Sequence, residues 1–261
     1  MNKNNIARLW GAVQAEFRTL YAGSLLGVLW FLLAPLLQVG MYVFLFQVVW
    51  KLRVNLHHGG DVSFVWFLLS AYIPYWAFQD ALSRAAGALT ANAHIIRNTP
   101  FPPWLLVVAR VMLPFGVMLA LVMPLWPMLH QAGHFQLQWA DGPWLAFTLM
   151  CLAGMAVGLA VLLASVGVVL RDLANIVPPL LMALMLTAPI MYPLQNVPEA
   201  MRGWFWLNPL TPFAEAFHTL LLTPQGLDLG HALAMPALAL GALWLGRWAY
   251  RKMAPDLPDL L

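Results

Sequence analysis

Long uninterrupted runs of apolar residues dominate this chain. Asp, Glu, Lys and Arg are absent from six intervals of at least 18 residues each: 19–50, 62–79, 111–140, 142–170, 173–198 and 229–246. A helix needs about 20 apolar residues to cross the hydrocarbon core of a bilayer. Backbone groups inside lipid must also be paired within their own segment, so such runs form helices. The pattern therefore predicts a membrane protein.

We expect one all-α domain over residues 1–261 with six membrane-spanning helices. The expected spans are about 27–49, 64–86, 105–129, 144–170, 176–192 and 231–250. Residues 1–23 have apolar positions at helical spacing and predict an amphipathic helix in the plane of the membrane interface. The segment 193–230 is too polar and proline-rich for a span but is rich in aromatic residues, which favours short re-entrant helices at the outer interface.

Basic residues are distributed unevenly between the two sets of expected loops. The N-terminal segment, the loop at 87–104, the turn at 171–172 and the C-terminal tail carry most of them. The opposite loops contain only Lys51, Arg53 and Arg202. Because Lys and Arg concentrate on the cytoplasmic side of membrane proteins, both termini are predicted to be cytoplasmic.

The composition agrees with an integral membrane domain. Of the 261 residues, 62% are hydrophobic and 9% are charged, whereas a soluble domain carries about 25% charged residues. The net charge of +3 is typical of cytoplasmic flanks and does not indicate nucleic-acid binding. Cys151 is the single cysteine, so no intrachain disulfide can form.

The sequence lacks the motifs that would let the chain use ATP. None of its three lysines follows a glycine, so it has no P-loop. We expect no cofactor and no catalytic site in this chain. The energy for any transport must come from a partner or an ion gradient.

The candidates for ionisable residues of an ion-coupled transporter are Asp80, Arg84 and Arg110. Asp80 and Arg84 are four residues apart on one helical face, which favours a self-neutralising pair. A proton relay is the alternative, because ionisable residues at membrane depth often mark ion pathways. Arg110 lies near the cytoplasmic end of its span, and we expect its side chain to snorkel toward the interface.

The histidines offer a weak metal-site pattern. His57 and His58 share one expected outer loop, and His130 and His134 have the i, i+4 spacing that one helical face can use for zinc. No carboxylate is placed to act as a base or second partner. We therefore expect ordinary interfacial histidines and no metal.

Two further groups of residues suggest binding surfaces. The segment A-N-A-H-I-I-R-N-T-P-F-P-P-W at 91–104 combines helix-breaking prolines with apolar residues, which favours docking onto another protein over an ordinary helix connection. Aromatic residues also recur along the first two spans. They suit either core packing or the lining of a sugar-conducting pore, for which the candidates are Tyr42, Phe46, Tyr72 and Tyr75.

Five short motifs occur in order along almost the whole chain. They are E-F-R-T-L-Y-A-G-S-L-L-G-V-L-W-F-L-L-A-P-L at 16–36, N-A-H-I-I-R-N-T-P-F-P at 92–102, R-D-L-A-N-I at 171–176, A-P-I-M-Y-P at 188–193 and N-P-L-T at 208–211. Together they resemble the permease subunits of bacterial polysaccharide ABC exporters, which export O-antigen, capsule or teichoic-acid chains. In one departure, Leu20 and Ala22 flank Tyr21 where that family usually has basic residues.

The resemblance implies an inner-membrane permease that is not itself an enzyme. Two copies would form a channel between them, and two copies of a separate ATPase subunit, binding ATP and Mg²⁺, would drive export of a lipid-linked glycan. A permease of the same fold for a drug or small lipid is one alternative. An intramembrane enzyme acting on lipid-linked sugars is the other, with Asp80 as its one candidate acid.

The resemblance also implies roles for particular residues. Coupling to the ATPase would involve Ile95, Ile96, Arg97, Asn98, Thr99, Phe101 and Pro102. Substrate entry would involve Arg18, Tyr21, Ser24 and Trp30. A cytoplasmic turn would contain Arg171 and Asp172, and an outer gate would contain Trp204, Trp206, Asn208 and Pro209.

Overall fold

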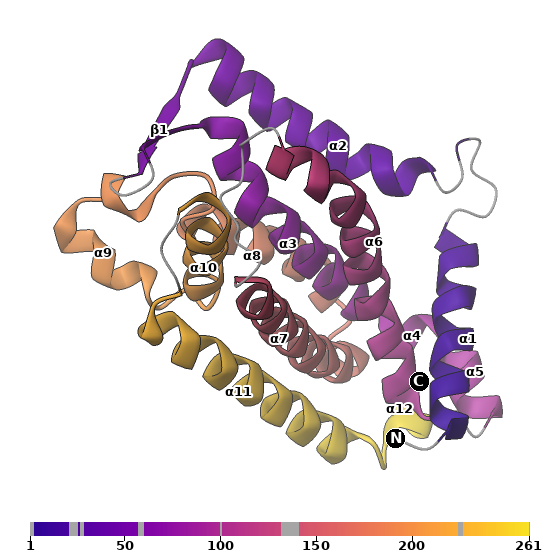
Figure 1. The fold of residues 1–261 in the computed structure, drawn as a ribbon. Helices are drawn as coiled ribbons and strands as arrows, with labels where there is room; N and C mark the ends of the chain where they lie inside the picture. The colour runs from indigo at the N-terminus through magenta and orange to yellow at the C-terminus, as the bar shows by residue number, and fades with distance from the viewer. Residues whose placement is uncertain are drawn as a thin grey trace.

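The fold is a bundle of helices with one small β-hairpin (Figure 1). It is known from a computed structural model that describes residues 3–20, 26, 29–56, 60–99, 101–131, 141–223 and 227–260. The predicted, mostly helical fold is confirmed.

Three helices of the described chain are long and apolar enough to cross a membrane. They are α6 (Pro103–Gln131), over its first 18 residues, α7 (Gly142–Val169) and α11 (Leu229–Met253). Helix α2 (Trp30–Val43), continued by the π-helix η2 (Phe44–Val49), and helix α8 (Leu173–Thr187) are apolar but shorter. Helix α3 (Phe64–Ala85) has 22 residues but carries Asp80 and Arg84. The count of six spans stays a prediction.

Helix α7 lies in the middle of the bundle, with α11 along one side (Figure 1). The two helices approach so closely that a Cβ added to Gly158 would overlap the backbone of Ala242 and Leu243. A Cβ on Gly246 would likewise overlap the backbone of Gly158. Small residues allow such backbone contact between membrane helices, and close packing is what holds them together.

Helix α3 supplies much of the buried core. Its side chains pack against α6, α7 and α10 (Thr211–Leu222). The fully buried large residues of α3 include Phe64, Phe67, Leu68, Tyr72 and Phe78. Large rings packed between helices contribute through van der Waals contact and ring–ring interactions, since lipid is as apolar as the core.

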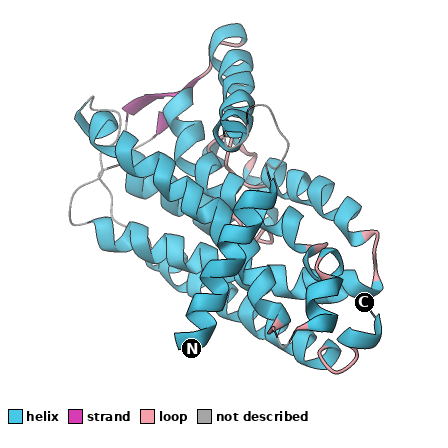
Figure 2. Ribbon diagram, turned by 90° about the vertical axis from the view of Figure 1, so that its right-hand side faces the viewer, coloured by secondary structure: helices cyan, strands magenta, loops and turns pink. Residues whose placement is uncertain are grey.

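The bundle has two distinct ends. Helices α1 (Lys3–Leu20), α4 (Ala88–Ala91), α5 (Ala93–Asn98) and α12 (Leu257–Leu260) gather at one end. Strands β1 (Arg53–Leu56) and β2 (Gly60–Ser63) and helix α9 (Glu199–Phe205) lie at the other (Figures 1 and 2). The first and last described helices therefore lie at the same end, as an even number of spans requires.

The hairpin is a departure from the all-α expectation, which is wrong for this segment. Strands β1 and β2 pair antiparallel, with Arg53 opposite Ser63 and Leu56 opposite Gly60. Apolar Val54 alternates with polar neighbours and is buried. This period of two is typical of a half-buried strand, and the sequence analysis treated the segment as a loop.

Helix α8 ends earlier than the span predicted to run to residue 192. Its last residue is Thr187, and Ala188 is extended, with ψ of 149°. Ala188 precedes Pro189, whose ring disfavours helical backbone in the residue before it. The short 3-10 helix η4 (Leu194–Asn196) and α9 then follow.

Candidate functional site

The predicted coupling segment folds into the two short helices α4 and α5. The Asn92 amide between them donates to the Ala88 carbonyl at 2.8 Å, and the Thr99 hydroxyl donates to the Ile95 carbonyl at 2.6 Å. Thr99 itself is extended, with φ of −135° and ψ of 144°, as expected for a residue before proline. The Ile95 carbonyl also accepts from the Thr99 backbone N–H, so backbone and side chain together cap the end of α5.

The predicted coupling residues fall into an outward-facing set and an anchoring set. Ile95, Arg97, Asn98 and Thr99 are exposed. Ile96 is half-buried against the main core, and Phe101 is half-buried in a separate small cluster. Pro102 is half-buried. The exposed set is available to a partner, whereas the anchoring set ties the segment to the bundle.

The small cluster joins the coupling segment to the N-terminal helix. Leu9 of α1 is buried there together with Leu105 and Ala109 of α6, and Phe101 packs against them. Trp10, the next residue along α1, is 60% exposed. The apolar side of α1 is therefore divided between contacts with α6 and an outward face.

Charged side chains link three helices beside this cluster. Arg84 Nε lies 2.7 Å from Asp80 Oδ2, which confirms the predicted pair. Arg110 Nη1 donates to the Arg84 carbonyl at 2.7 Å, and Arg110 Nε lies 3.3 Å from Glu16 Oε1. Arg110 was expected to snorkel, but its side chain is only 15% exposed and turns toward these partners.

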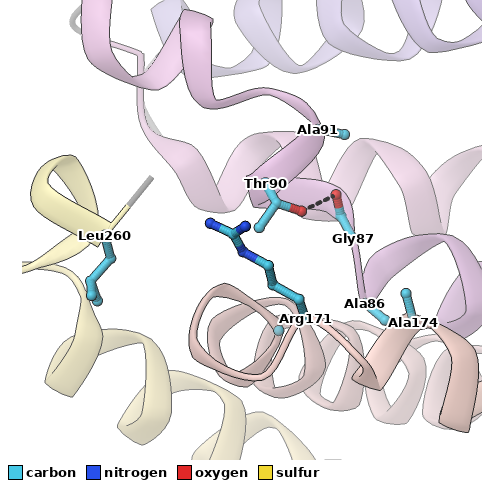
Figure 3. A pocket seen from close by; sticks show the side chains of 8 residues that line it. Ala86, Gly87, Thr90, Ala91, Arg171, Ala174 and Leu260 are labelled. Carbon is cyan, nitrogen blue, oxygen red and sulfur yellow. Dashed lines mark hydrogen bonds between the residues drawn. The ribbon is translucent and has the colours of Figure 1, made fainter.

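A cavity of about 430 Å³ opens at the same end of the bundle (Figure 3). It is lined by Ala86, Gly87, Thr90, Ala91, Gly167, Arg171, Ala174 and Leu260. Arg171, from the turn between α7 and α8, extends toward the space between Thr90 and Leu260 (Figure 3). Both Arg171 and Asp172 are exposed. The predicted cytoplasmic turn and the coupling segment are thus neighbours.

The predicted channel residues belong to two groups of aromatic contacts inside the chain. Tyr42 lies edge-on to Tyr72 with ring centroids 5.4 Å apart, and Phe46 lies 4.9 Å from Phe64. Tyr72 and Tyr75 are buried, and the Tyr75 hydroxyl donates to the Leu181 carbonyl at 2.8 Å. Within the described chain, the Tyr72 hydroxyl finds no hydrogen-bond partner. Their role in a channel stays a prediction.

The predicted outer-gate residues also separate. Asn208 is buried and donates to the Leu184 carbonyl at 2.7 Å and to the Thr187 hydroxyl at 2.9 Å. Pro209 is half-buried. Trp204 is 71% exposed, and Trp206 stacks on the ring of His231. Asn208 thus fixes the segment to the end of α8, and Trp204 faces outward.

The sequence analysis missed a buried histidine on α10. His218 Nε2 lies 2.9 Å from the Pro189 carbonyl, which can only accept, so this nitrogen carries the proton. The Ser70 hydroxyl lies 2.8 Å from Nδ1, and the Phe67 ring stacks on the imidazole at 3.9 Å. Burial lowers the pKa of His218 to about 4, so it is neutral near pH 7. No local motif marks this tie between α3, α10 and the segment after α8.

Other predicted sites are only partly visible. Arg18 and Trp30 are exposed, whereas Tyr21 and Ser24 lie outside the described residues. Of the histidines, His57, His58 and His134 also lie outside them, and nothing is described of the His130 side chain. Across the described ranges, no three His, Cys, Asp or Glu residues are grouped so as to hold a metal ion.

Comparison with known proteins gives a family and several relatives. A family model described as "ABC-2 type transporter" matches residues 8–222. The O-antigen export system permease protein RfbA of Myxococcus xanthus is 28% identical over 239 residues, covering 89% of this chain and 86% of that protein. The polysialic acid transport protein KpsM of Escherichia coli is 26% identical, covering 90% and 89%. An RfbA of Klebsiella pneumoniae is 24% identical, covering 79% and 77%.

Proposed function

This chain belongs to the ABC-2 type transporter family, and we propose that it is the permease of an ATP-driven exporter of lipid-linked polysaccharide. The named functions of its relatives, O-antigen export and polysialic acid transport, support this substrate class. The proposed cargo is a glycan of O-antigen or capsule type, carried across the bacterial inner membrane. The exposed coupling segment is the observation that carries the proposal.

ATP hydrolysis takes place on a separate subunit, because the sequence contains no P-loop. Two ABC ATPase subunits, with ATP and Mg²⁺, dock on the end of the bundle formed by α4, α5 and the turn at 171–172. Ile95, Arg97, Asn98 and Thr99 contact the ATPase, since they are exposed. Ile96, Phe101 and Pro102 pass its movement to the bundle, since they pack against it.

A second copy of the chain completes the channel. Leu37, Met41, Phe44 and Val48 follow one face of α2 and η2, and each is more than half exposed. We assign this apolar face to the other copy. Tyr42 covers Tyr72, so separation of α2 from α3 would open Tyr42, Phe46, Tyr72 and Tyr75 to a passing glycan. Aromatic faces stack on sugar rings without requiring one particular sugar.

Six spans place both termini in the cytoplasm in this proposal. Helix α1 lies at the cytoplasmic interface, where Arg18, Tyr21, Ser24 and Trp30 meet the anionic head group of the lipid carrier. Helices α9 and α10 form re-entrant elements at the outer surface. Trp204 and Trp206 bound the exit there, and Asn208 and Pro209 hold the segment in place.

Two rival functions can be separated from this one. A permease for a drug or small lipid would also work with an ATPase subunit. It would transport its substrate even in cells that make no lipid-linked glycan. An intramembrane enzyme would need Asp80 as an acid, although Asp80 is paired with Arg84. Unaltered function of an Asp80→Asn variant would remove the enzyme.

Ile95→Asp tests the proposed ATPase contact. The variant places an unpaired charge in an apolar contact, so capture of the co-expressed ATPase by tagged permease should fall about tenfold or more. Phe101→Asp is less informative, because Phe101 packs beneath α1 and its loss would also disturb the fold.

Leu229→Asp is the matched control, since Leu229 is exposed at the opposite end of the bundle. It should leave ATPase capture unchanged. Full ATPase capture and full glycan export by Ile95→Asp would contradict the proposed coupling surface.

A further inference from the structure

Arg110 connects two segments that the proposed function uses separately. From its position on α6 it donates to the Arg84 carbonyl and forms an ion pair with Glu16. The Arg110 and Glu16 side chains are only 15% and 17% exposed, respectively. Contacts to a charged group at such low exposure hold more firmly than surface ion pairs.

One contact fixes the point where α3 passes into the coupling segment. Helix α3 ends at Ala85, so the Arg84 carbonyl lies in its last turn, where carbonyls lack helical donors. Arg110 supplies a donor there at 2.7 Å. The Arg84 side chain is held independently by Asp80. Arg110 therefore restrains the junction between α3 and α4 through the backbone of Arg84, whereas the Arg84 side chain is paired within α3.

The ion pair between Arg110 and Glu16 fixes the C-terminal part of α1. Glu16 lies in the last third of α1, two positions before Arg18. Closer to the middle of the same helix, Leu9 is buried against Leu105 and Ala109 of α6. Helix α1 is thus attached to α6 at two points, one apolar and one charged, and a rigid helix held at two points follows its support.

We propose that Arg110 is a positioning residue that makes α1 move together with the α3–α4 junction. This inference rests on the proposed function, in which the ATPase displaces α4 and α5 and α1 presents the lipid head group. ATP binding on the partner then shifts α1, and with it the residues at substrate entry. The Arg110 guanidinium thus ties loading of the cargo to the ATPase cycle, in addition to the apolar contact between Phe101 and Leu9.

Spin labels on α1 and α5 test this in the complete permease–ATPase complex in lipid nanodiscs. A Cys151→Ser background removes the single native thiol. Labels are placed at Ala7→Cys on α1 and, in a second protein, at His94→Cys on α5, both of which are exposed positions. A non-hydrolysable ATP analogue should change the mobility of both labels. In Arg110→Met the His94 label should still respond, and the Ala7 response should fall, since only the apolar contact of Phe101 with Leu9 then remains.

Further variants separate positioning from folding. Glu16→Gln removes the charge of the ion pair from the side of α1 and should also reduce the Ala7 response. Arg110→Lys keeps a charge and a donor and should restore part of it. Arg247→Gln, which alters an exposed arginine on α11, should leave both responses intact.

The outcomes distinguish the two levels of the proposal. An Ala7 response of undiminished size in both Arg110→Met and Glu16→Gln, while His94 responds, overturns the role of Arg110 alone. A parent complex in which neither label responds to nucleotide overturns the proposed transmission of ATPase movement through α4 and α5, and this inference with it.

Discussion

Single polar side chains hold this apolar bundle together at defined points. His218, Asn208 and Arg110 each bond to a carbonyl of another helix or segment. A buried polar group without a partner costs about 1–3 kcal/mol, so each contact fixes one arrangement of the elements it joins. In a core made mostly of interchangeable apolar residues, these few contacts provide specificity.

Replacement of His218 by Phe should destabilise the protein by about 1–3 kcal/mol near pH 7. The new ring can stack on Phe67, but it leaves the Ser70 hydroxyl and the Pro189 carbonyl without this partner. Labelling of the buried Cys151 thiol during heating measures unfolding. Thr223→Val is the control, since the Thr223 hydroxyl bonds only to its own helix in the described contacts.

The effect of His218 should depend on pH. Its folded pKa, about 4, lies below the ordinary 6.5 because of burial, so the unfolded chain takes up the proton first. The stabilisation is complete above about pH 6.5 and is lost as the pH falls toward 4. Wild-type and His218→Phe should therefore approach each other in stability by about 2 kcal/mol between about pH 7 and about pH 5.

The stability of the wild-type protein must be compared with that of His218→Phe, because protonation of Glu215 changes the stability in the opposite direction. Burial raises the pKa of Glu215 to about 7, from 4.5. Its folded form therefore binds the proton first, and stability rises as the pH falls through that range. Glu215 is present in both proteins, so it cancels in the difference. A difference that stays constant with pH would contradict the buried neutral state of His218.

At the scale of elements, two modes of packing coexist. Helices α7 and α11 meet backbone to backbone through Gly158 and Gly246. Helices α3 and α10 meet through aromatic rings, as where Phe67 stacks on His218. The backbone contact between α7 and α11 leaves no room for added atoms. The ring contacts between α3 and α10 depend on side-chain rotamers, which can adjust.

Gly158→Ala should weaken the contact between α7 and α11 by about 1–3 kcal/mol or prevent folding, because the new Cβ meets the backbone of Ala242. Gly154→Ala is the matched control on the same helix, since its Cβ would lie at an ordinary 3.7 Å from the Ala239 Cβ. Labelling of the Cys151 thiol during heating measures the difference in stability between the two variants. Equal stability of the two variants would contradict the tight seam.

At the scale of the whole molecule, the exposed apolar face of α2 is the proposed contact with a second copy of the chain. Met41 on this face is 71% exposed, although it lies on an apolar helix. In a Cys151→Ser background, Met41→Cys should form a disulfide-linked dimer in membranes, because the proposed second copy packs there. Leu240→Cys, on the exposed face of α11, should remain monomeric. Crosslinking of Leu240→Cys alone would place the dimer contact elsewhere.

Much of this architecture was predictable from local pattern. The bounds of α7 follow from Asp141 and Arg171, the charges that flank its apolar run, and the Asp80–Arg84 pair follows from i, i+4 spacing. The Ser70–His218 contact joins residues 148 positions apart, and no spacing rule reaches that far. The packing of Phe101 beside Leu9 of a distant helix likewise has no local signal in the sequence.

The seam between α7 and α11 bears on how a transporter of this kind can move. Two helices whose main chains touch at Gly158 and Gly246 cannot slide past one another by changing rotamers, since no side chain lies between them there. Helices α7 and α11 therefore form one rigid unit. The movements of the transport cycle belong to the elements around these two helices. Two labels, one on α7 and one on α11, should stay at constant separation through every turnover.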